Sequence, residues 1–210
     1  MSVILQNIIL GISLAAPIGP ANVAVMKQGF SKGFFFGFIT GLGVVTADLF
    51  YLLVIYFGIS PFFKIPIIQT AIWILGAIIL FLMGYRSIKE FFNKTDFNEE
   101  KPKEKNAFLE GFLINISNPM AIVWWTGVFG ASLSESLNLS ADKLKVLFSS
   151  MTIIVGLLIW VFIVALLTHW GKRFLNEKSM GYISLIAGLL LIIFGLKFGY
   201  NAITFISNAK

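Results

Sequence analysis

The sequence predicts an all-α, polytopic membrane protein whose six transmembrane helices form two inverted three-helix repeats. Of its 210 residues, 58% are hydrophobic and only 12% are charged, whereas a soluble domain is about half apolar and a quarter charged. The mean hydropathy is +0.89. The apolar residues fall into six runs, each near the roughly 20 residues that span a bilayer. Prolines interrupt two of these runs, and the two lie about half a chain apart.

Short connections separate the predicted spans, except between the third and the fourth. In order, the spans are about Val3–Met26, Gly33–Phe57, Ile65–Tyr85, Ala107–Ala131, Leu144–Thr168 and Gly181–Phe198. The long connection, 86–106, is charged and has almost no apolar content, so we expect a mobile surface loop there. We therefore interpret 1–210 as one membrane domain. Its repeat halves are about 1–92 and 106–210, joined by the charged loop 86–106.

The first span contains the strongest break, at Ala16–Asn22, which reads A-P-I-G-P-A-N. Pro17 and Pro20 have no N–H to donate to the carbonyls of Ser13 and Ala16, so two acceptors are released. Irregular backbone at membrane depth is tolerated only where it is buried in protein or lines a cavity. A helix that begins at Pro20 would direct its unpaired N–H groups and positive dipole end into the gap. Such a gap can hold a zwitterion.

The first span also lacks a basic start, because no Lys or Arg precedes Lys27. A secretory signal peptide begins with a positively charged region. We therefore expect this segment to be retained as a membrane span.

The second span combines a glycine ladder with a buried acid. Gly29, Gly33, Gly37 and Gly41 recur every four residues, and small residues at this spacing let membrane helices approach closely. Asp48 lies two turns beyond Gly41 and is the carboxylate deepest within any span. An acid at the bilayer centre costs about 2.5–3.5 kcal/mol on insertion scales and marks a functional site by default. The alternative is a structural hydrogen bond to another span.

The fourth span contains the second break. Asn115 and Asn118 are three residues apart and share a helix face, and Pro119 releases the carbonyl of Asn115. Taken alone, this is equally an ordinary kink. However, Pro119 lies 99 residues after Pro20, in the first span of the second half. Helices interrupted at corresponding positions of two inverted halves point to a transporter binding site near the membrane midplane.

The basic residues predict the orientation of the chain. Eleven lie on connections one, three and five: Lys27, Lys32, Arg86, Lys89, Lys94, Lys101, Lys103, Lys105, Lys172, Arg173 and Lys178. The other five are Lys64, Lys143, Lys145, Lys197 and Lys210. By the positive-inside rule, the eleven are cytoplasmic and both termini are extracytoplasmic. Topology thus accounts for the net charge of +6, and we expect no nucleic-acid partner.

Other chemistry has little support in the sequence. The chain has no cysteine, which excludes disulfides and thiolate metal sites. No His/Asp/Glu cluster has metal-ligand spacing, no glycine-rich phosphate loop follows a strand, and no nucleophile has a partner. We interpret His169 as interfacial, Trp124-Trp125 as packing, and Glu110 as a carboxylate near a helix N-terminus. We therefore predict no catalytic residues, metal or cofactor, and no enzyme activity.

Taken together, these motifs resemble the LysE/RhtB amino-acid exporter family. The resemblance rests on P-I-G-P-A-N at 17–22, the glycine ladder, Asp48, and G-F-L at 111–113 followed by Asn115 and Asn118-Pro119, and it covers nearly the whole chain. It implies an exporter of amino acids and related small solutes in the bacterial inner membrane, generally driven by the proton motive force. Two departures leave the solute open. Met120 stands where many members have a basic residue, and Ala21 where the basic-amino-acid branch has glutamine.

Our hypothesis is an alternating-access exporter of a small zwitterion. The predicted substrate and ion pathway comprises Ala16, Pro17, Gly19, Pro20, Asn22, Asp48, Asn115, Asn118 and Pro119. The substrate carboxylate would meet the N–H groups near Pro20, since anions favour helix N-termini. Its ammonium would meet the carbonyls of Ala16 and Asn115, with Asn118 as a neutral aligner. Asp48 would bind the ammonium or carry the coupling proton.

Two other functional classes also fit the sequence. A passive small-solute channel could use the same broken helices, and a membrane enzyme or scaffold would give them a structural role only. The partners we expect are an amino acid, protons and the lipid bilayer, and the sequence leaves homo-oligomerisation open.

Overall fold

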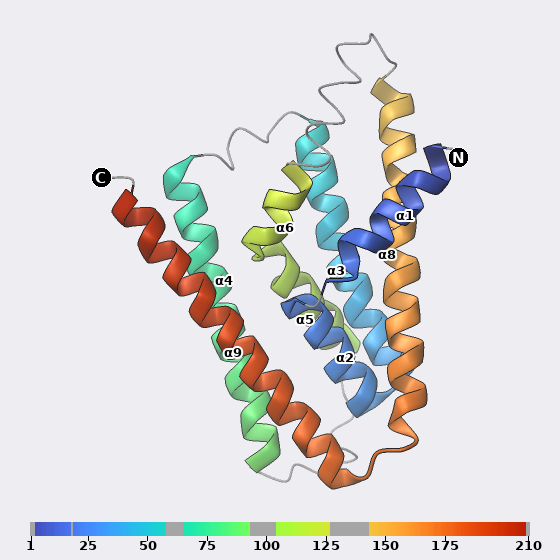
Figure 1. Ribbon diagram of the computed structural model, residues 1–210, viewed down its shortest axis with the longest axis vertical. Coiled ribbons are helices and arrows are strands. Elements are labelled where there is room, and N and C mark those ends of the chain that lie inside the picture. The colour runs from blue at the N-terminus through green and yellow to red at the C-terminus, as the bar shows by residue number, and fades with distance from the viewer. Residues whose placement is uncertain (1–2, 18, 58–64, 93–103, 127–142, 209–210) are drawn as a thin grey trace.

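The computed structural model is all-helical, as predicted, and describes residues 3–17, 19–57, 65–92, 104–126 and 143–208. Its helices are α1 (Val3–Ala15), α2 (Pro20–Lys32), α3 (Phe34–Tyr56), α4 (Pro66–Phe92), α5 (Glu104–Ile116), α6 (Pro119–Trp124), α8 (Lys143–Lys172) and α9 (Glu177–Asn208) (Figure 1). Both predicted breaks separate two helices, α1 from α2 and α5 from α6.

By length and composition, four described helices can cross a membrane: α3, α4, α8 and α9. The pair α1 and α2, bent by 82°, makes a fifth candidate span. The predicted fourth span falls on α5 and α6 and is not among these candidates; its last residues, 127–131, lie outside the described part of the chain. The described residues thus contain four or five candidate spans of the six predicted.

The predicted bounds of the loop 86–106 are wrong at both ends, because helices extend into it. Helix α4 continues through Arg86 and Lys89 to Phe92, and α5 already begins at Glu104. Charged residues end an apolar run without ending a helix. The last turns of α4 are stabilised by packing, because the ring of Phe91 lies 5.4 Å from that of Tyr182 on α9. Residues 93–103, the centre of the predicted loop, lie outside the described residues.

The helices form two groups with α2 between them. Helices α4 and α9 run side by side at the left of Figure 1, while α1 packs on α8, and α3 on α5. One apolar core joins α3, α6 and α8 around Tyr51 and Leu52. A second joins α2, α4, α5 and α9 around Leu80 and Leu191. Because α2 contacts α3, α5, α8 and α9, its first turn lies where the two groups meet.

The glycine ladder has two roles. A Cβ at Gly29 would overlap the Thr168 side chain and one at Gly41 would overlap Val161, both on α8, while Gly37 lies against Gly29. These three allow the close packing that their spacing predicts. Gly33 differs, because it closes the turn between α2 and α3 with a φ of 97°, a conformation that favours glycine.

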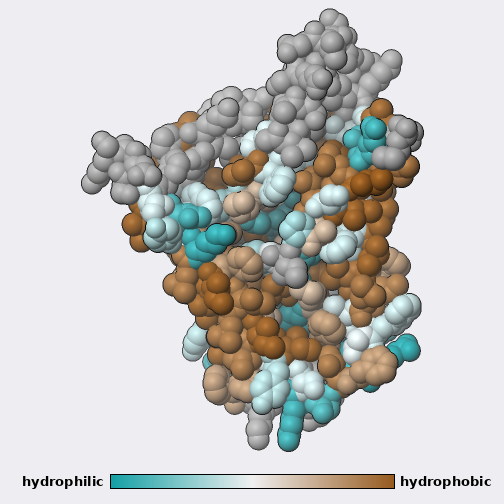
Figure 2. Space-filling view, in the orientation of Figure 1, coloured by the Kyte–Doolittle hydropathy of each residue, from teal (hydrophilic) through white to brown (hydrophobic). Residues whose placement is uncertain are grey.

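The surface agrees with a membrane setting. Figure 2 shows brown, apolar side chains over the middle of the molecule, and paler and hydrophilic residues in a recess in the upper half of this face. The exposed apolar residues include Ile78 and Leu82 of α4 and Ile186 and Ile193 of α9. Both ends of the chain lie at the upper end of the molecule, and the connections α2–α3 and α8–α9 lie at the lower end (Figure 1).

Candidate functional site

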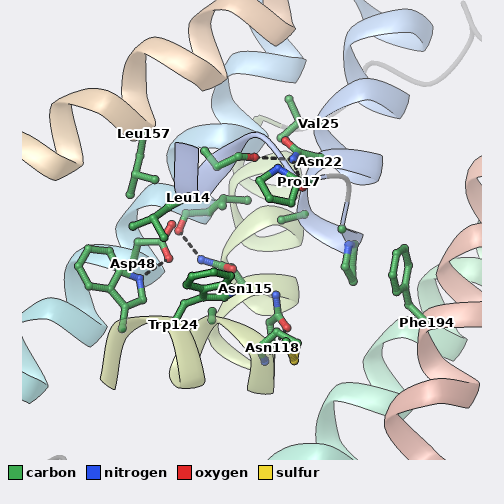
Figure 3. A pocket seen from close by; sticks show the side chains of 18 of the residues that line it. Leu14, Pro17, Asn22, Val25, Asp48, Asn115, Asn118, Trp124, Leu157 and Phe194 are labelled. Atoms are coloured by element: carbon green, nitrogen blue, oxygen red, sulfur yellow. Dashed lines mark hydrogen bonds between the residues drawn. The ribbon is translucent and has the colours of Figure 1, made fainter. Parts of the chain in front are cut away.

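A cavity of about 280 Å³ lies where the broken helices meet α3, α8 and α9 (Figure 3). Seven of the nine predicted pathway residues line it: Pro17, Gly19, Pro20, Asn22, Asp48, Asn115 and Asn118. Ala16 and Pro119 are not among the lining residues. The volume lies just below the roughly 300–1,000 Å³ of sites for drug-sized ligands, so the cavity suits a small solute.

The first break places the backbone N–H groups at the start of α2 beside the cavity. Gly19 is the N-cap of α2, with φ −130° and ψ −176°, and the first helical bond runs from the Val23 N–H to the Gly19 carbonyl, at 3.0 Å. The N–H groups of Ala21 and Asn22 therefore have no acceptor within the helix. A Cβ at Gly19 would meet nothing within 4 Å, so neither the backbone nor the available space requires a glycine there.

Asn22 braces this break from within the protein. Its Nδ2 donates to the carbonyls of Ala15, at 2.7 Å, and Pro17, at 2.8 Å. Its Oδ1 accepts from Nε1 of Trp160 on α8, at 3.2 Å. The sequence placed Asn22 in the substrate pathway and predicted an open carbonyl at Ala16. In the structure, this side chain already occupies the carbonyls on either side of Ala16.

The second break satisfies its own polar groups. Asn118 caps α6, its Oδ1 accepting from the N–H of Met120 at 3.1 Å. The carbonyl of Asn115 accepts from the Asn118 N–H at 3.0 Å and from the Tyr51 hydroxyl at 3.4 Å, and Tyr51 also donates to the Ile116 carbonyl at 2.6 Å. The expectation of a free Asn115 carbonyl is therefore wrong, because a local turn and a buried tyrosine supply the donors that Pro119 removes.

Asp48 joins three helices at the wall of the cavity. The residue is 9% exposed, and its Oδ1 accepts from Nε1 of Trp125, at 2.8 Å. The Asn115 side chain is a second hydrogen-bond partner of this carboxyl group, and its Nδ2 also donates to the Val44 carbonyl at 3.0 Å. Figure 3 shows Asp48 and Asn115 facing each other beside the first break. The predicted acid and the second break thus form one hydrogen-bonded group.

Four residues that matter here escaped the sequence reasoning: Tyr51, Trp125, Trp160 and Lys197. Trp125 packs in the core as predicted, but its N–H also holds Asp48. A buried indole N–H usually finds a hydrogen-bond partner. A tryptophan within an apolar span is therefore a candidate donor to a buried acid, and this was the signal in the sequence for Trp125. Lys197, counted only for its charge, lines the cavity from α9.

The lining is polar at two places. Among the described lining residues, Asp48 carries the one carboxyl group and Lys197 the one amine; the other polar side chains are asparagines and tryptophans. In the described part of the chain, no group of three or more His, Cys, Asp or Glu residues could hold a metal ion. This arrangement can bind and orient a small solute that carries both signs of charge.

Below the cavity, near the α2–α3 turn, polar contacts join α2 to α5 and α8 to α3. Gln28 of α2 donates from Nε2 to Oε2 of Glu110 on α5, at 2.5 Å. Glu110 lies further along its helix than we expected, since α5 begins at Glu104. The sole histidine, His169, accepts the N–H of Phe34 on Nδ1, at 3.3 Å, so it caps the start of α3.

Comparisons with known proteins agree with this picture. The family model described as LysE type translocator matches residues 12–202. The chain is 38% identical over 205 residues to the "Putative amino acid efflux protein YcgF" of Bacillus subtilis (strain 168), covering 97% of this chain and 98% of that protein. It is 26% identical over 194 residues to the uncharacterized membrane protein YrhP of the same organism, covering 87% and 91%. It is 29% identical over 83 residues to a threonine efflux protein of Salmonella typhi, covering 37% and 40%. No solved structure matches this chain.

Proposed function

Because this chain belongs to the LysE-type translocator family, whose members are transporters and not enzymes, we propose that it is a secondary active exporter of amino acids or closely related small zwitterions. It works by alternating access in the bacterial inner membrane. One observation carries the proposal: two helices broken at proline border a single cavity. Interrupted helices at the interface of two repeats are where such transporters hold their substrates.

The proposed fold has six spans in two inverted halves, and three close helix crossings support it. The crossings are α1–α8 at Gly11 and Gly156, α3–α5 at Gly43 and Gly111, and α4–α9 at Gly84 and Gly188. If the halves correspond, α1 matches α5, α3 matches α8, and α4 matches α9. The first crossing then maps onto the second, and the third maps onto itself, which is the behaviour expected of a two-fold axis between repeats.

In this proposal the start of α2 and Asp48 bind opposite ends of the substrate. Its carboxylate lies near the N–H groups of Ala21 and Asn22, because helix N-termini favour anions. Asp48 binds the ammonium or carries the coupling proton. Ala16 and Pro119 act through the backbone breaks that they border. The amino acid efflux names of two relatives support the substrate class.

We propose protons as the coupling ion and extracytoplasmic termini as the orientation. Asp48 supports the first, because it is the one carboxyl group among the described cavity residues. The lower end of the molecule supports the second, because Lys32, Lys172 and Arg173 lie on the elements gathered there and basic connections face the cytoplasm.

Counterflow in proteoliposomes tests the proposal. Liposomes that contain the full chain are loaded with each of the twenty amino acids in turn, and uptake of the same labelled amino acid is measured, with protein-free liposomes as the control. We expect saturable, trans-stimulated uptake of at least one amino acid and accumulation against its gradient when a proton gradient is imposed. A passive channel would give neither saturation nor counterflow. Absence of counterflow for every amino acid would show the proposal to be wrong.

A further inference from the structure

We propose that Lys197 binds the carboxylate of the transported solute, so that the site selects solutes with a free carboxyl group. This inference rests on the proposed function and adds a specificity-determining residue to it. Nothing in the sequence motifs singles out this lysine. It emerges from where α9 lies relative to the two broken helices.

Helix α9 presents two distinct faces. Ile193, Leu196, Tyr200 and Ile203 are exposed apolar or aromatic residues on one face. Phe194, Lys197, Phe198 and Asn201 follow the same helical spacing on the other, and all four line the cavity. Lys197 lies at the edge of the cavity face, one turn after Ile193, so it lines the cavity and is also exposed.

The position of Lys197 along α9 argues against simple snorkelling. Lysines near the ends of membrane helices reach the polar interface. The apolar part of α9 runs from Gly181 to Thr204, so Lys197 lies about two helical turns inside it. A lysine at such a depth is rare and faces a cavity or a partner.

The cavity face of α9 lies against the first turn of α2. Phe194 and Phe198, which bracket Lys197, belong to the apolar cluster that also contains Ala21 and Val23 of α2. Figure 3 shows Phe194 facing the start of α2. An anion at the N–H groups of Ala21 and Asn22 would therefore lie beside the turn of α9 that carries the Lys197 ammonium.

Three asparagines of the cavity already have hydrogen-bond partners. The Asn22 side chain bonds to the carbonyls of Ala15 and Pro17 and to the Trp160 indole. The Asn115 side chain bonds to the Val44 carbonyl and to Asp48. The side-chain oxygen of Asn118 caps α6. No hydrogen bond or ion pair links Lys197 to another described residue. The lysine is thus the one cation among the described lining residues, and it opposes Asp48 in sign.

The test uses the amino acid that wild-type protein exchanges fastest, its amide, and its decarboxylated amine, all in the counterflow assay. Wild type should accept the amino acid and discriminate against the two analogues, which lack the carboxylate. Lys197→Gln should raise the KM for the amino acid about tenfold, as expected for loss of a charge-assisted hydrogen bond, and leave the amide unchanged. Lys197→Arg should restore most of the discrimination.

Lys178→Gln, at the other end of α9 and outside the cavity lining, is the matched control and should exchange like wild type. If Lys197→Gln keeps the wild-type KM and the wild-type preference over the amide, the inference is wrong, even if expression falls. The Lys197→Arg variant covers the case in which Lys197→Gln does not fold. If Lys197→Arg keeps the wild-type KM for the amino acid and the wild-type discrimination, the result supports a cation at this position. If Lys197→Arg loses the discrimination, the inference is wrong. Failure of wild type to exchange any amino acid would instead refute the proposed function.

Discussion

The carboxyl group of Asp48 accepts the Trp125 indole N–H and the Asn115 amide. A charge-assisted hydrogen bond contributes roughly 1.5–3 kcal/mol, so this small network fixes the direction of the acid toward the cavity. A carboxyl group held in this way can exchange one proton or one ammonium with a ligand while its donors stay in place. The geometry therefore suits both roles that we consider for Asp48.

Replacing Asp48 with Asn tests these roles. We expect Asp48→Asn to reduce proton-driven accumulation of the amino acid at least about tenfold, because the variant has the same size but carries neither a charge nor a titratable proton. Counterflow without a proton gradient separates the two roles: it survives if Asp48 carries the proton and is lost if Asp48 binds the ammonium. Unchanged proton-driven accumulation would remove Asp48 from the mechanism.

Trp125→Phe and Trp124→Phe form a matched pair for the same experiment. Trp125→Phe removes the indole donor of Asp48 and should lower accumulation several-fold by loosening the carboxyl group. Trp124 is its neighbour and also lines the cavity, but its indole is not a partner of Asp48. Equal effects of the two changes would argue against the positioning role of Trp125.

At the residue scale, the sequence predicted which polar groups gather but not what they bind. Asp48, Asn115 and Asn22 were predictable because polar side chains inside apolar runs are costly. Their partners Tyr51, Trp125 and Trp160 were not, since each comes from another helix and looks like ordinary packing in the sequence. The carbonyl expected to be free at Asn115 accepts from Tyr51 for the same reason.

At the scale of helices, prolines predicted the two breaks and glycines predicted the close packing. Pro20 and Pro119 each occupy the first position of a new helix, where a missing N–H costs nothing. The 82° bend between α1 and α2 was beyond prediction, because it depends on Asn22, Trp160 and the helices on either side. The ends of α4 and α5 were also missed, since tertiary contacts extend helices past the apolar zone.

The crossing of α3 and α5 yields a prediction for stability. A Cβ at Gly43 would overlap the carbonyl oxygen of Phe108, whereas one at Gly199 on α9 would meet nothing within 4 Å. Gly43→Ala should therefore destabilise the protein by about 1–3 kcal/mol through overpacking. Gly199→Ala should be neutral or slightly stabilising, because alanine is the better helix former by about 1 kcal/mol. Thermal unfolding in detergent measures both, and equal midpoints would contradict the close crossing.

At the scale of the whole molecule, the absence of cysteine makes the orientation directly testable. We expect a cysteine at Phe174, in the α8–α9 connection, to react with a membrane-impermeant maleimide only after cells are permeabilised. A tag on the C-terminus should be accessible in intact cells. Phe174 is 89% exposed, so protection in intact cells would reflect its side of the membrane. Labelling of Phe174→Cys in intact cells would reverse the proposed orientation.

The shape of the cavity also indicates which end is closed. On α9 the lining runs from Phe194 to Asn201, toward the end of the molecule where both termini lie (Figure 1). At the opposite end, Gln28 and Ser31 of α2 are buried, and Gln28 bonds to Glu110. The contact between α2 and α5 therefore lies at the lower end, and in the alternating-access mechanism that we propose we expect these two helices to separate there to admit solute.

Gln28→Ala should shift this equilibrium. The bond to Glu110 is made in the state with a closed lower end, so its loss disfavours that state by roughly 1.5–3 kcal/mol, about a tenfold to hundredfold change in population. An Asn201→Cys reporter in the cavity should then react more slowly with an impermeant maleimide added from the side of the termini. Gln6→Ala, an exposed glutamine on α1, should leave the rate unchanged. A faster or equal rate in Gln28→Ala would mean that α2 and α5 stay together throughout transport, so that another pair of helices must open the lower end.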